Sequence, residues 1–176
     1  MNLRLKKTPG IYLVGFMGSG KSTVGRLLAE RLGWTFADID GEIERAEKAT
    51  IPEIFESRGE AEFRAIEARV LQSHICAIES GQPAVIAVGG GAFVQAANRE
   101  AMLKAGVTVW LDCPFEIVKR RVGMASHRPL ARDPERFAQL FEERRPVYAL
   151  AEVRVAIDCD DPAPAVEAIL AHPVLR

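Results

Sequence analysis

Apolar residues along this chain follow two alternating patterns. Short apolar runs, typical of buried strands, alternate with longer segments in which apolar residues recur every three or four positions, as in amphipathic helices. The predicted strands cover residues 11–14, 34–38, 84–88, 107–111 and 153–158. Because residues 84–88 are apolar throughout, we expect this strand to lie centrally in a parallel sheet that is covered on both faces.

The helix-periodic segments fall between these strands. Helices are predicted up to Gly33, from near residue 40, over 51–55, over about 60–79, around 98–104, from residue 114, from residue 134 and over about 162–171. Strands alternating with helices predict a three-layer α/β/α fold with a five-stranded parallel sheet and right-handed crossovers. We expect residues 1–176 to form a single domain.

Two segments between the predicted strands look like insertions over a ligand. Residues about 40–80 carry extra helices between the second and third strands, and residues about 123–133 lack periodicity and contain His127. The second segment is predicted to be a mobile loop. Insertions of this kind often cover the crevice at the carboxyl ends of parallel strands, where ligands bind.

Composition narrows the functional classes. The chain has 48% apolar residues and 23 basic against 24 acidic residues, so no bulk charge favours nucleic acid or a membrane surface. No apolar run has the length of a signal peptide core or a membrane span, which predicts a cytoplasmic protein. The three cysteines lack metal or disulfide spacing and are interpreted as buried small apolar residues.

The segment after the first strand matches the phosphate-binding loop pattern G-x-x-x-x-G-K-[ST]. It reads Gly15-Phe16-Met17-Gly18-Ser19-Gly20-Lys21-Ser22, and Thr23 follows. Its glycines let backbone N–H groups face phosphate oxygens, while the next helix presents the positive end of its dipole. Lys21 is expected to reach the β- and γ-phosphates and Ser22 to bind Mg²⁺. An ordinary glycine turn is the alternative, but Lys21-Ser22 favours binding of a nucleoside triphosphate.

Two carboxylates follow the second strand. Asp38 and Asp40 are two residues apart, so their side chains project to one side while the chain stays extended. One can hold Mg²⁺ while the other accepts a hydrogen bond from an alcohol, as phosphoryl transfer requires. Ala87 and Val88 supply no carboxylate at the third strand, so the protein ligands of the metal should be Ser22 and this pair. Alternatively, Asp40 is a helix N-cap and Asp38 a solvated strand end.

Further candidates are a triple glycine and three arginines. Gly89, Gly90 and Gly91 offer bare backbone to a ligand, or simply a sharp turn. Arg64 has Glu60 and Glu67 at helical spacing, so an ion pair is its alternative explanation. Arg144 near a helix end and Arg128 in the aperiodic loop either bind anions or serve as a dipole partner and a solvated cation.

In combination these motifs resemble the shikimate kinase family. The resemblance runs from about residue 11 to residue 171 and rests on an ordered set. The set comprises the phosphate-binding loop through Gly25, Asp38-Ile39-Asp40, Ile54-Phe55, Gly59-Glu60, Phe63-Arg64-x-x-Glu67, Gly89-Gly90-Gly91-Ala92, Arg128-Pro129-Leu130 and Arg144-x-Pro146-x-Tyr148.

The resemblance implies a nucleoside monophosphate kinase-like fold with a substrate-binding region and a lid, and ATP-dependent phosphorylation of the 3-hydroxyl of shikimate. It implies ATP and Mg²⁺ as cofactors and a monomer without nucleic-acid or membrane partners. The implied catalytic residues are Lys21, Asp40 and Arg128. ATP is assigned to Gly18, Ser19, Gly20, Lys21, Ser22, Thr23, Arg121, Arg128 and Pro162, and Mg²⁺ to Ser22 and Asp38. Shikimate is assigned to Asp40, Arg64, Gly89, Gly90, Gly91 and Arg144.

The chain departs from the family pattern at two places. Ala131 stands where a second leucine commonly follows Arg-Pro-Leu, and Arg145 adds a second cation beside Arg144. Adjacent helical residues point about 100° apart, so only one of the two arginines should face the site. Gluconate kinases and nucleoside monophosphate kinases share the loop and lid but not the joint motif set. A kinase-derived ligand-sensing module is the alternative outside enzymes.

Overall fold

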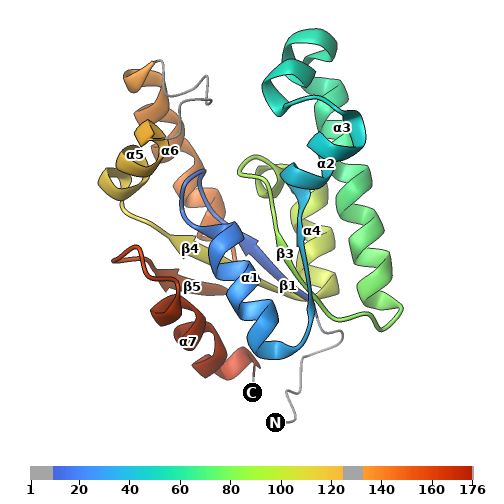
Figure 1. The fold of residues 1–176 in the computed structure, drawn as a ribbon, viewed down its shortest axis with the longest axis vertical. Helices are drawn as coiled ribbons and strands as arrows, with labels where there is room; N and C mark the ends of the chain where they lie inside the picture. Colours follow the sequence, from blue (N-terminus) through green and yellow to red (C-terminus); the bar gives the residue numbers. More distant parts are fainter. Residues whose placement is uncertain (1–9, 125–132, 176) are drawn as a thin grey trace.

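A computed structural model describes residues 10–124 and 133–175. Its core is a five-stranded parallel sheet in the order β2-β3-β1-β4-β5 (Figure 1). The strands are β1 (Gly10–Val14), β2 (Thr35–Asp38), β3 (Ala84–Ala87), β4 (Val107–Asp112) and β5 (Val153–Ala156). The predicted number and parallel direction of the strands are therefore confirmed.

Helices cover the sheet on both faces. In Figure 1, α1 and α7 lie in front of the sheet and α4 behind it. The helices are α1 (Lys21–Leu32), α2 (Ile39–Glu47), α3 (Ile51–Glu79), α4 (Ala96–Ala105), α5 (Phe115–Met124), α6 (Pro134–Tyr148) and α7 (Ala163–Ala171), with 3₁₀ turns η1 (Ala92–Val94) and η3 (Pro173–Leu175). Strands β1, β3 and β4 are buried at every position, as expected for strands covered on both faces.

The strand order fixes where a ligand can bind. Strand β1 pairs with β3 on one side and β4 on the other, so the chain leaves β1 toward one half of the sheet and later crosses to the other half. In parallel sheets, ligands bind in the crevice beyond the carboxyl ends of the strands at this change of direction. The phosphate-binding loop follows β1, the aspartate pair follows β2 and the triple glycine follows β3. The topology therefore gathers all three at one edge.

One local prediction was wrong in detail and another was confirmed. The second strand gives way to α2 already at Ile39, so Asp40 lies in the first helical turn and not in extended chain. The predicted short and long helices are confirmed: the element α3 consists of two helices that meet in a kink at Gly59, whose φ of 82° and ψ of 168° are not helical. Glycine alone tolerates this conformation at low cost, which explains why the sequence signalled a break there. The 3₁₀ turn η1 was not predicted.

The cysteine interpretation needs a correction. Cys113 is buried, as expected, but Cys76 and Cys159 are exposed. Cys76 lies on the outer side of α3 and Cys159 in the loop after β5, and neither position is marked by the cysteine spacing. Among the described residues, the model contains no helix that is long and apolar enough to cross a membrane.

Candidate active site

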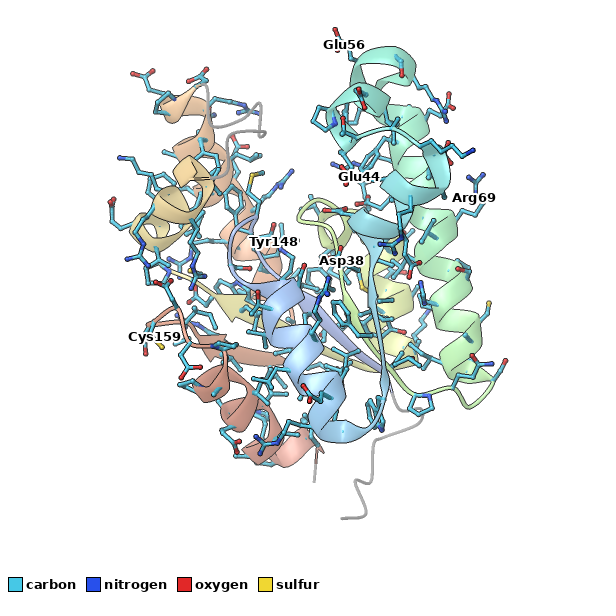
Figure 2. All side chains as sticks on the ribbon, in the orientation of Figure 1. Asp38, Glu44, Glu56, Arg69, Tyr148 and Cys159 are labelled. Atoms are coloured by element: carbon cyan, nitrogen blue, oxygen red, sulfur yellow. The ribbon has the colours of Figure 1, made fainter. Side chains whose placement is uncertain are left out.

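A cavity of about 780 Å³ opens at the carboxyl edge of the sheet. It is lined by the phosphate-binding loop, the ends of β2 and β3, the start of α3, Arg121 of α5, Arg144 of α6 and the loop before α7. The pair α2 and α3 rises above the sheet on one side and the pair α5 and α6 on the other (Figure 1). Asp38 and Tyr148 lie between these two pairs, near the middle of the molecule (Figure 2). The cavity thus lies at the edge that the topology selects.

The phosphate-binding loop has the backbone that its glycines permit. Gly18 and Gly20 adopt φ angles of 78° and 95°, which disfavour other residues. Gly20 directly precedes α1, so the positive end of this helix faces the cavity. Lys21 Nζ donates hydrogen bonds to the carbonyl oxygens of Gly15 and Phe16, each at 2.9 Å. The ammonium group is therefore held over the loop, where phosphate oxygens would bind.

Ser22 and Asp38 meet beside the loop. Ser22 Oγ donates a hydrogen bond of 2.5 Å to Asp38 Oδ2, and Asp38 Oδ1 accepts one of 3.3 Å from the backbone N–H of Gly41. Asp38, rather than Asp40, is thus the N-cap of α2. A hydroxyl and a carboxylate at the start of a phosphate-binding helix form the hard oxygen set that Mg²⁺ takes alongside phosphate oxygens. These residues fit the metal that the resemblance implies.

Asp40 and Glu67 meet over the bare backbone of Gly89. A Cβ atom on Gly89 would lie 2.6 Å from Asp40 Oδ1 and 2.8 Å from Glu67 Oε1, so a side chain there would collide with both carboxylates. Glu67 is only 1% exposed. Burial raises the pKa of its carboxyl, the charge of Asp40 adds to this effect, and Arg64 opposes it. The middle of α3 therefore carries a buried acid beside the candidate base.

Arg64 faces the cavity while keeping its helical ion pairs. It contacts Glu67 at 2.8 Å and the exposed Glu60 at 3.5 Å, as its spacing predicted. Its guanidinium also packs against the backbone of Gly91, where Nη1 would lie 2.6 Å from an added Cβ atom. The ring of Phe63 lies 5.2 Å from its Cζ. Among the described groups, its buried Nε has no hydrogen-bond partner. The ion-pair explanation and the site explanation are thus compatible.

The two adjacent arginines of α6 point to different places. Arg144 lines the cavity, with Nη1 3.4 Å from the Cβ position of Gly90 and Cζ 5.9 Å from the ring of Phe16. Arg145 Nη2 donates to Asp112 Oδ2 at 3.1 Å, and its Cζ lies 5.6 Å from the ring of Trp110. The structure therefore resolves the ambiguity in the sequence: Arg144 faces the cavity and Arg145 anchors α6 to the end of β4.

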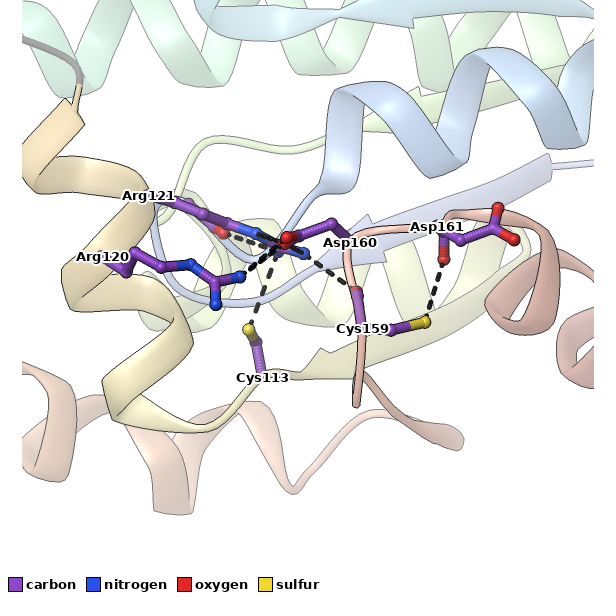
Figure 3. A network of polar contacts seen from close by, with 7 residues as sticks. Cys113, Arg120, Arg121, Cys159, Asp160 and Asp161 are labelled. Carbon is purple, nitrogen blue, oxygen red and sulfur yellow. Dashed lines mark hydrogen bonds and ion pairs between the residues drawn. The ribbon is translucent and has the colours of Figure 1, made fainter.

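At the far end of the cavity, Arg121 is held by acceptors from the phosphate-binding loop and from the loop after β5 (Figure 3). Its guanidinium donates to the carbonyl oxygens of Gly18 at 3.1 Å and Cys159 at 3.0 Å, and to Asp160 Oδ1 at 2.9 Å. Arg120 contacts the same carboxylate at 2.8 Å. The hydrogen bond from Arg121 lowers the pKa of the exposed Asp160 carboxyl, as does the charge of Arg120. Pro162 lines the cavity here too, so the two residues assigned to adenine share this end.

The structure brings most of the predicted site residues together. The cavity-lining residues among them are Gly18, Ser19, Gly20, Lys21, Ser22, Thr23, Asp38, Asp40, Arg64, Gly90, Gly91, Arg121, Arg144 and Pro162. Gly89 lies behind Asp40 and Glu67. The predicted lid, with Arg128, His127 and Ala131, lies largely outside the described residues. No sequence pattern marked Asp160, Glu67 was predicted only as an ion-pair partner of Arg64 and a motif residue, and Tyr148 only as a motif residue.

Comparisons with known proteins agree on one family. A protein-family sequence model described as "Shikimate kinase" matches residues 17–172 of this chain. Curated shikimate kinases from Persephonella marina and a Sulfurihydrogenibium species are 42% and 45% identical over 161 residues, which cover 91% of this chain and 96% and 95% of theirs. A solved shikimate kinase from Acinetobacter baumannii, in complex with shikimate, is 41% identical with a TM-score of 0.84, covering 92% of this chain and 90% of that one.

Proposed function

This chain belongs to the shikimate kinase family, and we propose that the residues lining its cleft transfer the γ-phosphoryl group of ATP to the 3-hydroxyl of shikimate. ATP-dependent phosphorylation of shikimate, with Mg²⁺, is the activity of the family to which the chain belongs. The proposal concerns which residues perform it here. The sensing-module and gluconate kinase alternatives are not favoured, because identities above 40% over nine tenths of the chain are to shikimate kinases.

In the proposal, shikimate binds between Arg64 and Arg144. Both guanidinium groups line the cavity, Arg64 from α3 in one helix pair and Arg144 from α6 in the other. Guanidinium groups bind a carboxylate through paired N–H donors, and two of them fix its orientation. Gly90 and Gly91 lie beside the two arginines and allow a small hydroxylated acid to approach the backbone. With its carboxylate bound by the two arginines, shikimate would point its hydroxyl groups toward Asp38 and Asp40.

ATP is assigned to the remaining part of the same cavity. The phosphate-binding loop and Lys21 would hold the β- and γ-phosphates, and Arg121 with Pro162 would flank the adenine. Ser22 and Asp38 would hold Mg²⁺, which supplies charge neutralisation to the phosphate oxygens. The role of Arg128 on the transferred phosphate stays a prediction from the family resemblance.

Asp40 is proposed to orient the reacting hydroxyl and accept its proton. As the oxygen of that hydroxyl bonds to the γ-phosphorus, the bond from phosphorus to the bridging oxygen of ADP breaks and the proton passes to the Asp40 carboxylate. Asp40 lies in the first turn of α2, where the positive helix end stabilises its ionised form. The buried Glu67 fixes Arg64 on the adjacent side. The proposed base and the proposed carboxylate-binding arginine thus have fixed places in the cavity.

One observation carries the proposal: Asp40, Arg64 and Arg144 come from three separate elements and line the same cavity as the phosphate-binding loop. The test is ATP turnover with shikimate, quinate, gluconate and nucleoside monophosphates as acceptors, with the phosphorylated position read by NMR. We expect turnover with shikimate far above the others and phosphate on the 3-oxygen. Turnover of another acceptor at the same rate, or binding of shikimate without turnover, would contradict the proposal.

Organisation of the chain is a separate part of the proposal. Residues 1–176 would act as a single-domain monomer in the cytoplasm, the compartment that supplies ATP. The described residues that the proposal assigns to shikimate and to ATP line one cavity within this chain, as a monomeric enzyme requires. Sedimentation equilibrium at the assay concentration measures the oligomeric state. If the activity per mole of chain rises with protein concentration, the enzyme is not an independent monomer.

A further inference from the structure

Tyr148 closes α6 with its hydroxyl at the substrate end of the cavity. Its side chain is 1% exposed, and Oη donates a hydrogen bond of 2.5 Å to the carbonyl oxygen of Gly90. Arg144 lies four residues earlier, on the same face of the helix. Its Nη1 and the phenol oxygen of Tyr148 lie 3.4 Å and 3.7 Å from the same point, the Cβ position of Gly90. The Tyr148 hydroxyl therefore lies where the Gly90 peptide meets the Arg144 guanidinium.

We infer that Tyr148 is a positioning residue for shikimate binding, which holds the backbone of Gly90 and the guanidinium of Arg144 in a fixed relation to each other. The inference rests on the proposed placement of shikimate against these two groups. Residues 89–91 are all glycine, the residue type whose backbone is least restricted. Such a segment binds a ligand well only if something outside it limits its freedom, since ordering it on binding costs conformational entropy. The Tyr148 hydroxyl supplies that restraint.

The surroundings of Tyr148 suit this role. Burial raises the pKa of its phenol to about 12, so the hydroxyl keeps its proton and remains a donor at neutral pH. The ring of Trp110 lies 6.4 Å from that of Tyr148. Arg145 and Arg154 lie over Trp110 at 5.6 Å and 5.2 Å, and both donate to Asp112. The ring of Tyr148 thus neighbours Trp110, which is covered by two arginines that Asp112 holds in place.

The chain provides a matched control. It has only two tyrosines, and the second, Tyr12, is equally buried but its hydroxyl has no hydrogen-bond partner among the described groups. Tyr148→Phe and Tyr12→Phe remove the same atom from the same kind of environment. We expect Tyr148→Phe to raise the Kd of shikimate about 5- to 20-fold, the effect of a lost buried hydrogen bond with an acceptor left unpaired. The Kd of ADP should stay unchanged, and Tyr12→Phe should change neither.

Calorimetric titration of each variant with shikimate and with ADP measures these constants, and steady-state kinetics should show a KM for shikimate that rises more than kcat falls. An unchanged Kd for shikimate, or an equal loss of affinity for both ligands, would overturn the inference. Arg64→Ala separates this failure from failure of the proposed site. If Arg64→Ala weakens shikimate binding and Tyr148→Phe does not, only the role of Tyr148 is wrong; if neither does, the placement of shikimate is wrong.

A second measurement covers the case in which Tyr148→Phe does not fold. The Tyr12→Phe protein produced with 3-fluorotyrosine carries a single fluorine label, at position 148. Saturating shikimate should shift the fluorine resonance of this label, because the ligand changes the polarity of the groups bonded to the phenol, while ADP should leave it in place. A resonance that shikimate does not move would equally overturn the inference.

Discussion

The proposed substrate end and the proposed nucleotide end of the cleft differ in how exposed the acid is that pairs with arginine. At the substrate end, Arg64 is 19% exposed and pairs with Glu67, which is 1% exposed. At the nucleotide end, Arg121 pairs with Asp160, whose side chain is 66% exposed. Solvent and salt screen the second pair strongly and the first only weakly. The substrate end should therefore be rigid and intolerant of substitution, and the nucleotide end adaptable.

This difference follows from what each end has to recognise. A small hydroxylated acid offers few atoms, so each contact has to be fixed before binding to discriminate it. The nucleotide offers a large adenine surface and a phosphate chain that the loop backbone is proposed to bind, so an arginine whose ion-pair partner is exposed to solvent suffices. Four substitutions test the comparison, from the largest expected effect to the smallest.

Asp40→Asn should lower kcat at least about 100-fold, because positioned acid and base groups contribute that much or more to rate. The affinity for ATP should stay close to that of the parent, since Asp40 belongs to the substrate end. Steady-state kinetics with both substrates measures the effect. Glu42→Gln is the control: this carboxylate lies on the same helix but is bonded to His74 at 2.7 Å. Retained turnover in Asp40→Asn would remove Asp40 from the chemistry.

Arg64→Ala should raise the KM for shikimate roughly 10- to 100-fold, the range for a charge-assisted hydrogen bond lost from a buried site. The KM for ATP should change little. Arg58→Ala serves as the control, because Arg58 lies on the same helix and makes ion pairs with Glu47 at 2.7 Å and Glu62 at 3.6 Å. An unchanged KM for shikimate would mean that Arg64 only forms its helical ion pairs and does not bind the substrate.

Glu67→Gln should change how stability depends on pH. Burial raises the folded-state pKa of Glu67 above its ordinary value of 4.5, so at intermediate pH the folded protein holds more protons than the unfolded chain. The stabilisation from this proton is present below the unfolded pKa and is lost as pH rises through the folded pKa. The free energy of unfolding of Glu67→Gln relative to the parent should therefore increase as pH rises through the folded-state pKa of Glu67. Urea titrations across this range measure it, and parallel curves would contradict the burial argument.

Asp160→Asn should have the smallest effect, raising the KM for ATP only about 2- to 5-fold, as expected for an exposed ion pair. High salt should shrink the difference from the parent, since salt screens the pair. The KM for shikimate should not change. Glu167→Gln, which breaks another exposed pair with Arg31 at 2.6 Å, should affect neither constant. A larger loss at Asp160 than at Arg64 would reverse the comparison between the two ends.

Several features were predictable from the sequence because they depend on local pattern. Alternating apolar runs and helical periodicity predicted the five strands and most helices, since burial on two faces requires apolar residues at every position of a strand. The loop ending in Lys21-Ser22 predicted a nucleotide site, because its mechanism needs those residues at that spacing. The ordered motifs predicted the family. Chain order at the carboxyl ends of the strands then predicted which loops would meet.

Tertiary structure alone decided which side chains contact each other and which face the cleft. Arg144 and Arg145 are equivalent in the sequence. Only the position of α6 beside the end of β4 lets Arg145 bind Asp112, while Arg144 faces the cleft. Asp38 caps α2 and meets Ser22 because the helix begins one residue earlier than the extended-chain argument assumed. Tyr148 reaches Gly90 across 58 residues of sequence. Contacts of this kind depend on distances between elements, which local patterns of residue type do not encode.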